Sequence, residues 1–287
     1  MTLIAGTKCK DGVVIAADTE HTDGVVKFQE HKLNVYPSDR VMTCHLSELA
    51  QSPYRVVVAG AGSSDYIKMA ADCIRDKIRD CPDRRMVEMC EAVKSSVRET
   101  HENIFKYWNP DDQNRPSLAL CVGLRRGEET KVLRTTDVAV SEVETMSFAG
   151  TGEPLARYLA GGLYRPKQSV VTVMNILVQV FRAVKESGAY VGGNTELCIL
   201  GKGKVFHIPG SETSYLWGLQ AKLHRAVRSA LESAKGHDAV CKHWAEDLAS
   251  SLERLRLERN NSPETDFNDW LTVEGNVDVD DPLEDVW

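Results

Sequence analysis

The stretch Thr2-Leu-Ile-Ala-Gly-Thr-Lys-Cys-Lys-Asp-Gly-Val-Val-Ile-Ala-Ala-Asp18 decides the fold of this 287-residue chain. Residues 3–9 and 13–17 are rich in strand-forming side chains, and the Asp-Gly pair between them is a strong signal for a two-residue hairpin turn. With Asp11-Gly12 as that turn, Thr2 faces His21 and Asp18 faces Ala5. The hairpin therefore brings the start of the chain and Asp18 to the same end of one ribbon.

The rest of the chain alternates between groups of strands and pairs of helices. Apolar spacing predicts helices over residues 67–78, 86–108 and 170–184, and another that begins near Pro154. Further strands are predicted at residues 32–36, 54–59, 117–124, 131–136, 146–149, 195–200 and 204–208. This order favours an α+β fold with two sheets between helix pairs over a regularly alternating α/β fold. We expect a core over residues 2–210, a helical C-terminal extension over 211–262 and an acidic tail over 263–287.

Composition and charge narrow the class of protein. The chain is 42% hydrophobic and 27% charged, as in ordinary globular proteins, and its net charge of −7 gives no reason to expect nucleic acid or a membrane as partner. The N-terminus lacks a signal-peptide pattern, and the eight cysteines are scattered without a CxxC pair. We therefore expect a cytoplasmic protein with reduced thiols. The acidic tail is interpreted as a solvated end or as a docking element for a neighbouring subunit.

The quoted stretch resembles the N-terminus of proteasome β-type subunits, which belong to the N-terminal nucleophile (Ntn) hydrolases. Their mature chains begin with Thr and reach an Asp after the same 16-residue spacing that separates Thr2 from Asp18. The likeness covers residues 2–210 and implies a four-layer αββα sandwich. The other matching positions are Thr22 and Gly24, Lys32, Ala59-Gly60, Phe148-Ala-Gly-Thr-Gly152 and Tyr190-Val-Gly-Gly193.

An N-terminal threonine can activate its own hydroxyl. A free α-amine titrates at about 7.7–8.0 and can accept the hydroxyl proton near neutral pH. We expect methionine aminopeptidase to remove Met1 and expose this amine on Thr2. The resemblance implies that Lys32 lies beside the Thr2 hydroxyl, and that Asp18 pairs with Lys32.

The resemblance also implies roles for four further residues. The backbone N–H of Gly60 would donate to the oxyanion, and Thr151 would support the catalytic centre. Thr22 would hold the substrate backbone, and Val58 would shape a pocket for apolar side chains. Two plainer interpretations stay open, since Gly60 could be a turn glycine and Thr151 could cap the following helix.

The chain departs from the family in one place. Active proteasome subunits carry an Asp and a Ser where this chain has Gly188 and Val191. Those two side chains help to orient the N-terminus. Here either Ser187 or Glu186 replaces them, or their loss reduces activity.

The sequence therefore predicts a threonine-type peptidase that acts on peptide or protein substrates without a cofactor. We expect it to form a homo-oligomeric ring or a related assembly, with an ATP-dependent unfoldase as a possible partner. Two alternatives are a non-catalytic subunit of the same fold and an amidohydrolase for a small molecule. No metal site is expected, because His237, Cys241 and His243 lack a fourth ligand at suitable spacing.

Overall fold

The computed structural model describes residues 2–23, 26–29, 31–37, 47–48, 52–81, 83–106, 117–187, 191–201, 205–214 and 218. The chain divides into two units, Met1–Trp217 and Gly218–Trp287, and all the described residues except Gly218 belong to the first. The predicted acidic tail, nearly all of the predicted helical extension and the residues His237, Cys241 and His243 lie outside the described residues.

The first sheet has six antiparallel strands in the order β11-β1-β2-β12-β13-β6. Its strands are β1 (Leu3–Lys8), β2 (Gly12–Asp18), β6 (Ser47–Glu48), β11 (Met146–Gly150), β12 (Thr195–Gly201) and β13 (Val205–Ile208). β2 and β12 are buried along their whole length, so this sheet is covered on both faces.

The second sheet has five antiparallel strands in the order β10-β9-β8-β7-β5. Its strands are β5 (Leu33–Tyr36), β7 (Tyr54–Gly62), β8 (Leu118–Arg126), β9 (Glu129–Thr136) and β10 (Ala139–Glu142). A separate hairpin pairs β3 (Glu20–Asp23) with β4 (Val26–Gln29). The two large sheets pack on each other through apolar side chains that include Ile4, Ile15, Val57 and Cys121.

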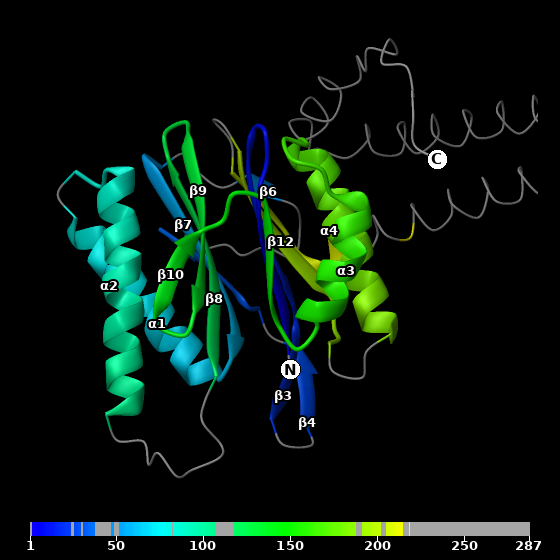
Figure 1. Ribbon diagram of the computed structural model, residues 1–287, viewed down its shortest axis with the longest axis horizontal. Helices are drawn as coiled ribbons and strands as arrows, with labels where there is room; N and C mark the ends of the chain where they lie inside the picture. Colours follow the sequence, from blue (N-terminus) through cyan, green and yellow to red (C-terminus); the bar gives the residue numbers. More distant parts are fainter. Residues whose placement is uncertain are drawn as a thin grey trace, which may run out of the picture. The chain divides into compact units, whose positions relative to one another are not determined.

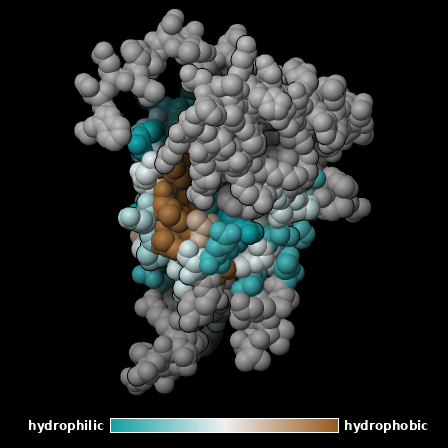
Figure 2. Space-filling model, turned by 90° about the vertical axis from the view of Figure 1, so that its right-hand side faces the viewer, coloured by the Kyte–Doolittle hydropathy of each residue, from teal (hydrophilic) through white to brown (hydrophobic). Residues whose placement is uncertain are grey.

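Helices cover the outer faces of both sheets (Figure 1). On the five-stranded sheet, α1 (Ser64–Asp80) packs on β7 and β8, and α2 (Met86–Phe105) packs on β8, β9 and β10. α3 (Glu153–Leu163) packs on β11, and α4 (Val170–Ser187) packs on β2 and β12. On the side of α3 and α4, Figure 2 shows an apolar patch among hydrophilic residues. The chain is thus a mixed α+β protein with two antiparallel sheets.

The predicted periodicities locate most elements correctly. Val170, Val173, Leu177, Phe181 and Val184 are all buried on α4, as their helical spacing predicts. The prediction missed four short strands: β3, β4, β6 and β10. β7 also runs three residues further than predicted, through Gly60 to Gly62.

The register of the first hairpin differs from the prediction by two residues. Ile4 pairs with Ala17, and the N–H of Cys9 donates to the carbonyl of Gly12, so Lys10-Asp11 forms the turn. Gly12 is instead the first residue of β2, where a Cβ would come within 2.5 Å of the Leu200 carbonyl oxygen on β12. Contact with β12, and not turn geometry, therefore requires this glycine. The shift moves Asp18 from opposite Ala5 to opposite Leu3.

Candidate active site

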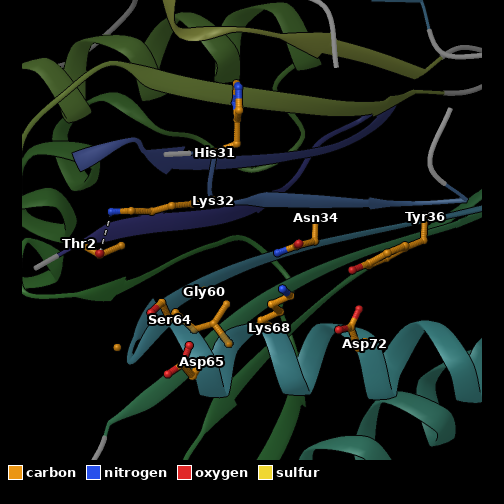
Figure 3. A pocket seen from close by; sticks show the side chains of 12 residues that line it. Thr2, His31, Lys32, Asn34, Tyr36, Gly60, Ser64, Asp65, Lys68 and Asp72 are labelled. Atoms are coloured by element: carbon orange, nitrogen blue, oxygen red, sulfur yellow. Dashed lines mark hydrogen bonds between the residues drawn. The ribbon is translucent and has the colours of Figure 1, made fainter. Parts of the chain in front are cut away.

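Thr2, Asp18 and Lys32 meet at one end of the two sheets. Lys32 Nζ lies 2.9 Å from Thr2 Oγ1 and 3.0 Å from Asp18 Oδ1 (Figure 3). The same ammonium donates to the backbone carbonyl of Glu20. The structure therefore brings together the three residues predicted to carry the chemistry.

The hairpin fixes the start of the chain. Asp18 ends β2, and its Oδ1 accepts a hydrogen bond of 3.0 Å from the backbone N–H of Leu3. On the other side of β1, Leu3 pairs with Gly150. Gly150 has a φ of +100°, and a Cβ there would lie 2.0 Å from the Thr2 carbonyl oxygen, so this position requires glycine. Thr2 is thus held between β2 and β11.

Burial controls the electrostatics of this group. Asp18 is 0% exposed, while Thr2 and Lys32 are each 8% exposed. Burial lowers the pKa of Lys32, and the negative charges of Asp18, Glu20 and Glu196 oppose that shift. Burial also raises the pKa of Asp18, against the charge of Lys32. Lys32 is thus a hydrogen-bond donor to the Thr2 hydroxyl whose proton is held less tightly than that of an ordinary lysine.

Gly60 lies beside Thr2 and Lys32 in the lining of the same cavity. It belongs to β7, where it pairs with Leu120, and its φ is not positive. A Cβ at Gly60 would come within 2.3 Å of Cγ2 of Ile67 on α1. The interpretation of Gly60 as a turn glycine is therefore wrong, because the close approach of α1 is what excludes a side chain here.

The cavity next to Thr2 has a volume of about 470 Å³ and a polar wall. Asn34 and Tyr36 follow Lys32 at alternate positions along β5 and line it, facing Lys68 and Asp72 of α1 (Figure 3). Asp72 is hydrogen-bonded to the Tyr36 hydroxyl and accepts a 2.6 Å bond from Nη1 of Arg75. Arg75 also lies 5.5 Å from the centre of the Tyr36 ring. A polar side chain would find partners in this cavity.

Val58, which was expected to shape this cavity, does not line it. It is fully buried and packs in the apolar cluster between β7 and the helices α1 and α2. Because Val58 and Gly60 are two residues apart on one strand, both point to the helix side of the sheet. The expectation of a pocket for apolar side chains thus has no support from the residues that surround the cavity.

Thr151 lies outside the cavity lining, and the role of Thr22 stays a prediction. Thr151 is exposed and does not line the cavity, and Gly152 occupies the N-cap position of α3 that Thr151 was considered for. Thr22 lies on β3, where its backbone pairs with Lys27. Its side chain is outside the described part of the chain.

The late segment of the chain differs from the family pattern in its packing. Gly188 lies outside the described residues, and Val191 is 6% exposed and packs against Gly152. Ser187 and Glu186 are exposed on α4, and Glu186 accepts a 2.6 Å bond from Nε of Arg182. Neither of these two residues therefore takes the place of the missing Asp and Ser.

Sequence reasoning missed Lys185, which approaches the site from α4. Its Nζ donates to Thr195 Oγ1 at 2.7 Å, and Thr195 pairs with Asp18 across β12 and β2. Burial lowers the pKa of Lys185 to about 8, although the charge of Asp18 opposes the shift. The sequence signal that could have indicated Lys185 is its position beside the apolar residues Val184 and Phe181 of α4.

Among the described residues, no group of three or more His, Cys, Asp or Glu side chains could hold a metal ion. None of their helices is both long enough and apolar enough to cross a membrane.

Comparisons with solved structures show which fold this is. The chain is similar to a Gly-1 mutant of Anbu from Hyphomicrobium sp. strain MC1, with a TM-score of 0.60 and 16% identity over 83% of this chain and 100% of that one. Anbu from Pseudomonas aeruginosa, solved as a helical assembly, has a TM-score of 0.62 and 12% identity over 80% of this chain and 95% of that one. Anbu from Yersinia bercovieri, described as an ancestral β-subunit, has a TM-score of 0.57 and 14% identity over 88% of this chain and 97% of that one. The chain therefore has the fold of these proteasome-like β-subunits.

Sequence comparisons add little to this. No protein-family model matches the chain. A protein of Escherichia coli (strain K12), provisionally named a D-alanyl-D-alanine carboxypeptidase, is 37% identical over 68 residues. That match spans 24% of this chain and only 14% of that protein's length.

Proposed function

We propose that this chain is a threonine-type peptidase with the four-layer αββα arrangement of N-terminal nucleophile hydrolases. Thr2, freed by removal of Met1, is the nucleophile. The observation that carries the proposal is the 2.9 Å hydrogen bond from Lys32 Nζ to Thr2 Oγ1, with Asp18 on the other side of the ammonium. An ammonium that donates to a hydroxyl can stabilise its ionised form, which is what activation of a threonine nucleophile requires.

In the proposed reaction the α-amine of Thr2 takes the hydroxyl proton while Oγ1 attacks the carbonyl carbon of the scissile amide. The charge of Lys32 stabilises the developing alkoxide, and the backbone N–H of Gly60 donates to the oxyanion. The C–N bond then breaks, and the leaving amine takes the proton from the Thr2 ammonium. Water hydrolyses the resulting acyl ester and restores the Thr2 hydroxyl.

The cavity beside Thr2 selects the substrate in this proposal. Its wall combines Asn34, Tyr36, Lys68 and Asp72. We therefore expect cleavage after polar side chains, in place of the apolar preference expected from Val58. The backbone of β3, which includes Thr22, would pair with the substrate as an added strand.

Self-association is part of the proposal. The Pseudomonas aeruginosa relative forms a helical assembly, and rings are characteristic of proteasome subunits. We propose that this chain assembles from identical copies in the cytoplasm, and that an ATP-dependent unfoldase could deliver substrates to it. Light scattering on the full chain, coupled to size exclusion, would measure the assembly, and a strictly monomeric chain would contradict this part.

Intact-mass spectrometry tests the catalytic proposal. We expect the purified chain to lack Met1 and to gain a single adduct from a peptide epoxyketone, a reagent that requires both the amine and the hydroxyl of an N-terminal threonine. Thr2→Ala should abolish the adduct, whereas Thr151→Val, at an exposed position outside the cavity, should leave it unchanged. Retention of Met1 in protein from its native cell would end the case for catalysis.

A second candidate is an amidohydrolase for a small molecule. The polar lining and the size of the cavity favour it, since Asn34, Tyr36 and Asp72 could hold a compact polar ligand. Both candidates use the same nucleophile and therefore give the same adduct. Turnover of fluorogenic peptides against small aliphatic amides would separate them.

A further inference from the structure

Glu196 is a buried carboxylate that the proposed reaction does not use. It lies on β12, where it is the single charged residue in the segment Thr195–Gly201, and it is 1% exposed. Across the sheet it pairs with Ala17, the residue before Asp18. A buried charge is costly unless it has partners, so its contacts should explain why it is there.

The partners of Glu196 are three consecutive residues at the start of β5. Burial raises the pKa of this carboxyl, and the hydrogen bonds from His31 and from the backbone N–H groups of Lys32 and Leu33 oppose that shift, while Oε2 itself has no hydrogen-bond partner among the described residues. Nδ1 of His31 makes a short contact with its Oε1. His31 also contributes to the lining of the cavity, and Figure 3 shows its side chain pointing away from α1. One carboxylate thus holds the backbone on which the Lys32 side chain is mounted.

This contact joins the two sheets at the candidate site. Thr2 and Asp18 belong to the six-stranded sheet, whereas Lys32 directly precedes β5 of the five-stranded sheet. The apolar core between the sheets is non-directional and does not by itself fix how one sheet lies along the other. The hydrogen bonds of Glu196 are directional and charge-assisted, and they act next to the position where alignment matters.

We propose that Glu196, held by His31, is a positioning residue that ties the start of β5 to β12 and so fixes Lys32 against Thr2. The tie itself is a structural claim, and only its effect on reactivity rests on the proposed function. The other ionisable groups around Glu196 are Lys32 and, near His31, His207 on β13. His207 is 1% exposed, and burial lowers its pKa to about 4, so it stays neutral and does not compete for the carboxylate.

Two substitutions separate the role of the hydrogen-bond acceptor from that of the charge. Glu196→Leu removes the acceptor at similar volume, and Glu196→Gln keeps one carbonyl oxygen as an acceptor. Glu186→Gln is the matched control, because Glu186 is an exposed carboxylate on α4 paired with Arg182. The rate of amide hydrogen exchange at Lys32 and Leu33, followed by NMR, measures whether Glu196 holds this segment. This measurement does not require the chain to be active.

We expect Glu196→Leu to speed exchange at these two amides by at least about tenfold, because they lose their acceptor. The maximal rate of epoxyketone addition to Thr2 should fall about 10- to 100-fold from misplacement of Lys32, with little change in the half-saturating concentration. Glu196→Gln should recover much of both values. A purely structural role would lower stability without this split between rate and affinity.

Unchanged exchange at Lys32 and Leu33 in Glu196→Leu would overturn the proposal. If the unmodified chain forms no adduct at all, the proposed function fails, but the exchange measurement still decides the tie. If Glu196→Leu does not fold, His31→Ala takes its place, since the His31 side chain is 59% exposed. Faster exchange at the same amides, reversed by His31→Asn, would support the proposal, and exchange equal to that of the unmodified chain would overturn it.

Discussion

The two sheets contribute differently to the site. The six-stranded sheet supplies Thr2 and Asp18, which are buried and held by backbone contacts to β11 and within the hairpin. The five-stranded sheet supplies Lys32 and Gly60, and with α1 it builds the polar cavity. The proposed nucleophile thus lies on a buried wall, while the surface that would recognise a substrate is open and hydrophilic. Changes on the first sheet should alter rate, and changes on the second wall should alter selection.

The largest effect is expected where the two sheets meet. Lys32→Met removes the ammonium beside Thr2 Oγ1, and we expect epoxyketone addition to slow by about 10²- to 10⁴-fold. Lys94→Met, at an exposed lysine of α2 outside the cavity lining, is the control and should change the rate by less than about threefold. Mass spectrometry of the adduct over time measures both. A loss below tenfold for Lys32→Met would mean that the ammonium is not needed.

Gly60→Ala tests how closely the five-stranded sheet must approach α1. The added Cβ would meet Ile67, and we expect a loss of about 1–3 kcal/mol in the free energy of unfolding. In the double variant Gly60→Ala/Ile67→Ala, the shorter side chain at position 67 makes room for the added Cβ. The loss in the free energy of unfolding, measured with urea, should therefore be smaller than the sum of the losses in the two single variants. Gly161→Ala on α3, where nothing lies within 4 Å, should instead stabilise the chain by about 0.5–1 kcal/mol. Equal effects at Gly60 and Gly161 would contradict this account.

Asp72→Asn tests the assignment of selection to the cavity wall. The substitution removes the charge that Arg75 and the Tyr36 hydroxyl contact, so we expect kcat/KM for polar peptides to fall about 3- to 10-fold. The rate for peptides with an apolar side chain should change less. Asp76→Asn, one turn further along α1 and outside the cavity lining, is the control. Parallel losses for polar and apolar peptides would remove the cavity from substrate selection.

The smallest effect concerns Lys185 and the pH dependence of stability. Its pKa is about 8 in the folded chain and 10.5 ordinarily, so the unfolded chain binds more protons between these values. The free energy of unfolding should therefore rise with pH in this window, by at most about 1.4 kcal/mol per pH unit. Lys185→Met should remove that rise, and Lys94→Met on the exposed surface of α2 should not. Urea unfolding at several pH values would show whether the slope survives in Lys185→Met.

The sequence could predict the elements, because hairpins and helices leave a local signal. The meeting of Thr2, Asp18 and Lys32 was predicted from the resemblance to proteasome β-type subunits. It could not predict the register of the first hairpin, since Gly12 satisfies a contact with β12 that lies almost 190 residues away in the chain. The pocket role of Val58 and the interpretation of Gly60 as a turn glycine failed for a related reason, because the path of α1 decides what their side of β7 faces. The isolated charge of Glu196 in an apolar strand was a usable signal, but its partners at the start of β5 were not visible in it.

The division of Thr2 and Lys32 between two sheets has a consequence for synthesis of the chain. Neither sheet alone contains both groups, so a partly folded chain in which only one sheet has formed has no reactive hydroxyl–ammonium pair. If Thr2 acts as proposed, a newborn molecule would stay inert toward its neighbours until both sheets have formed and joined. A reagent directed at this pair would accordingly count completed molecules and ignore the unfinished ones.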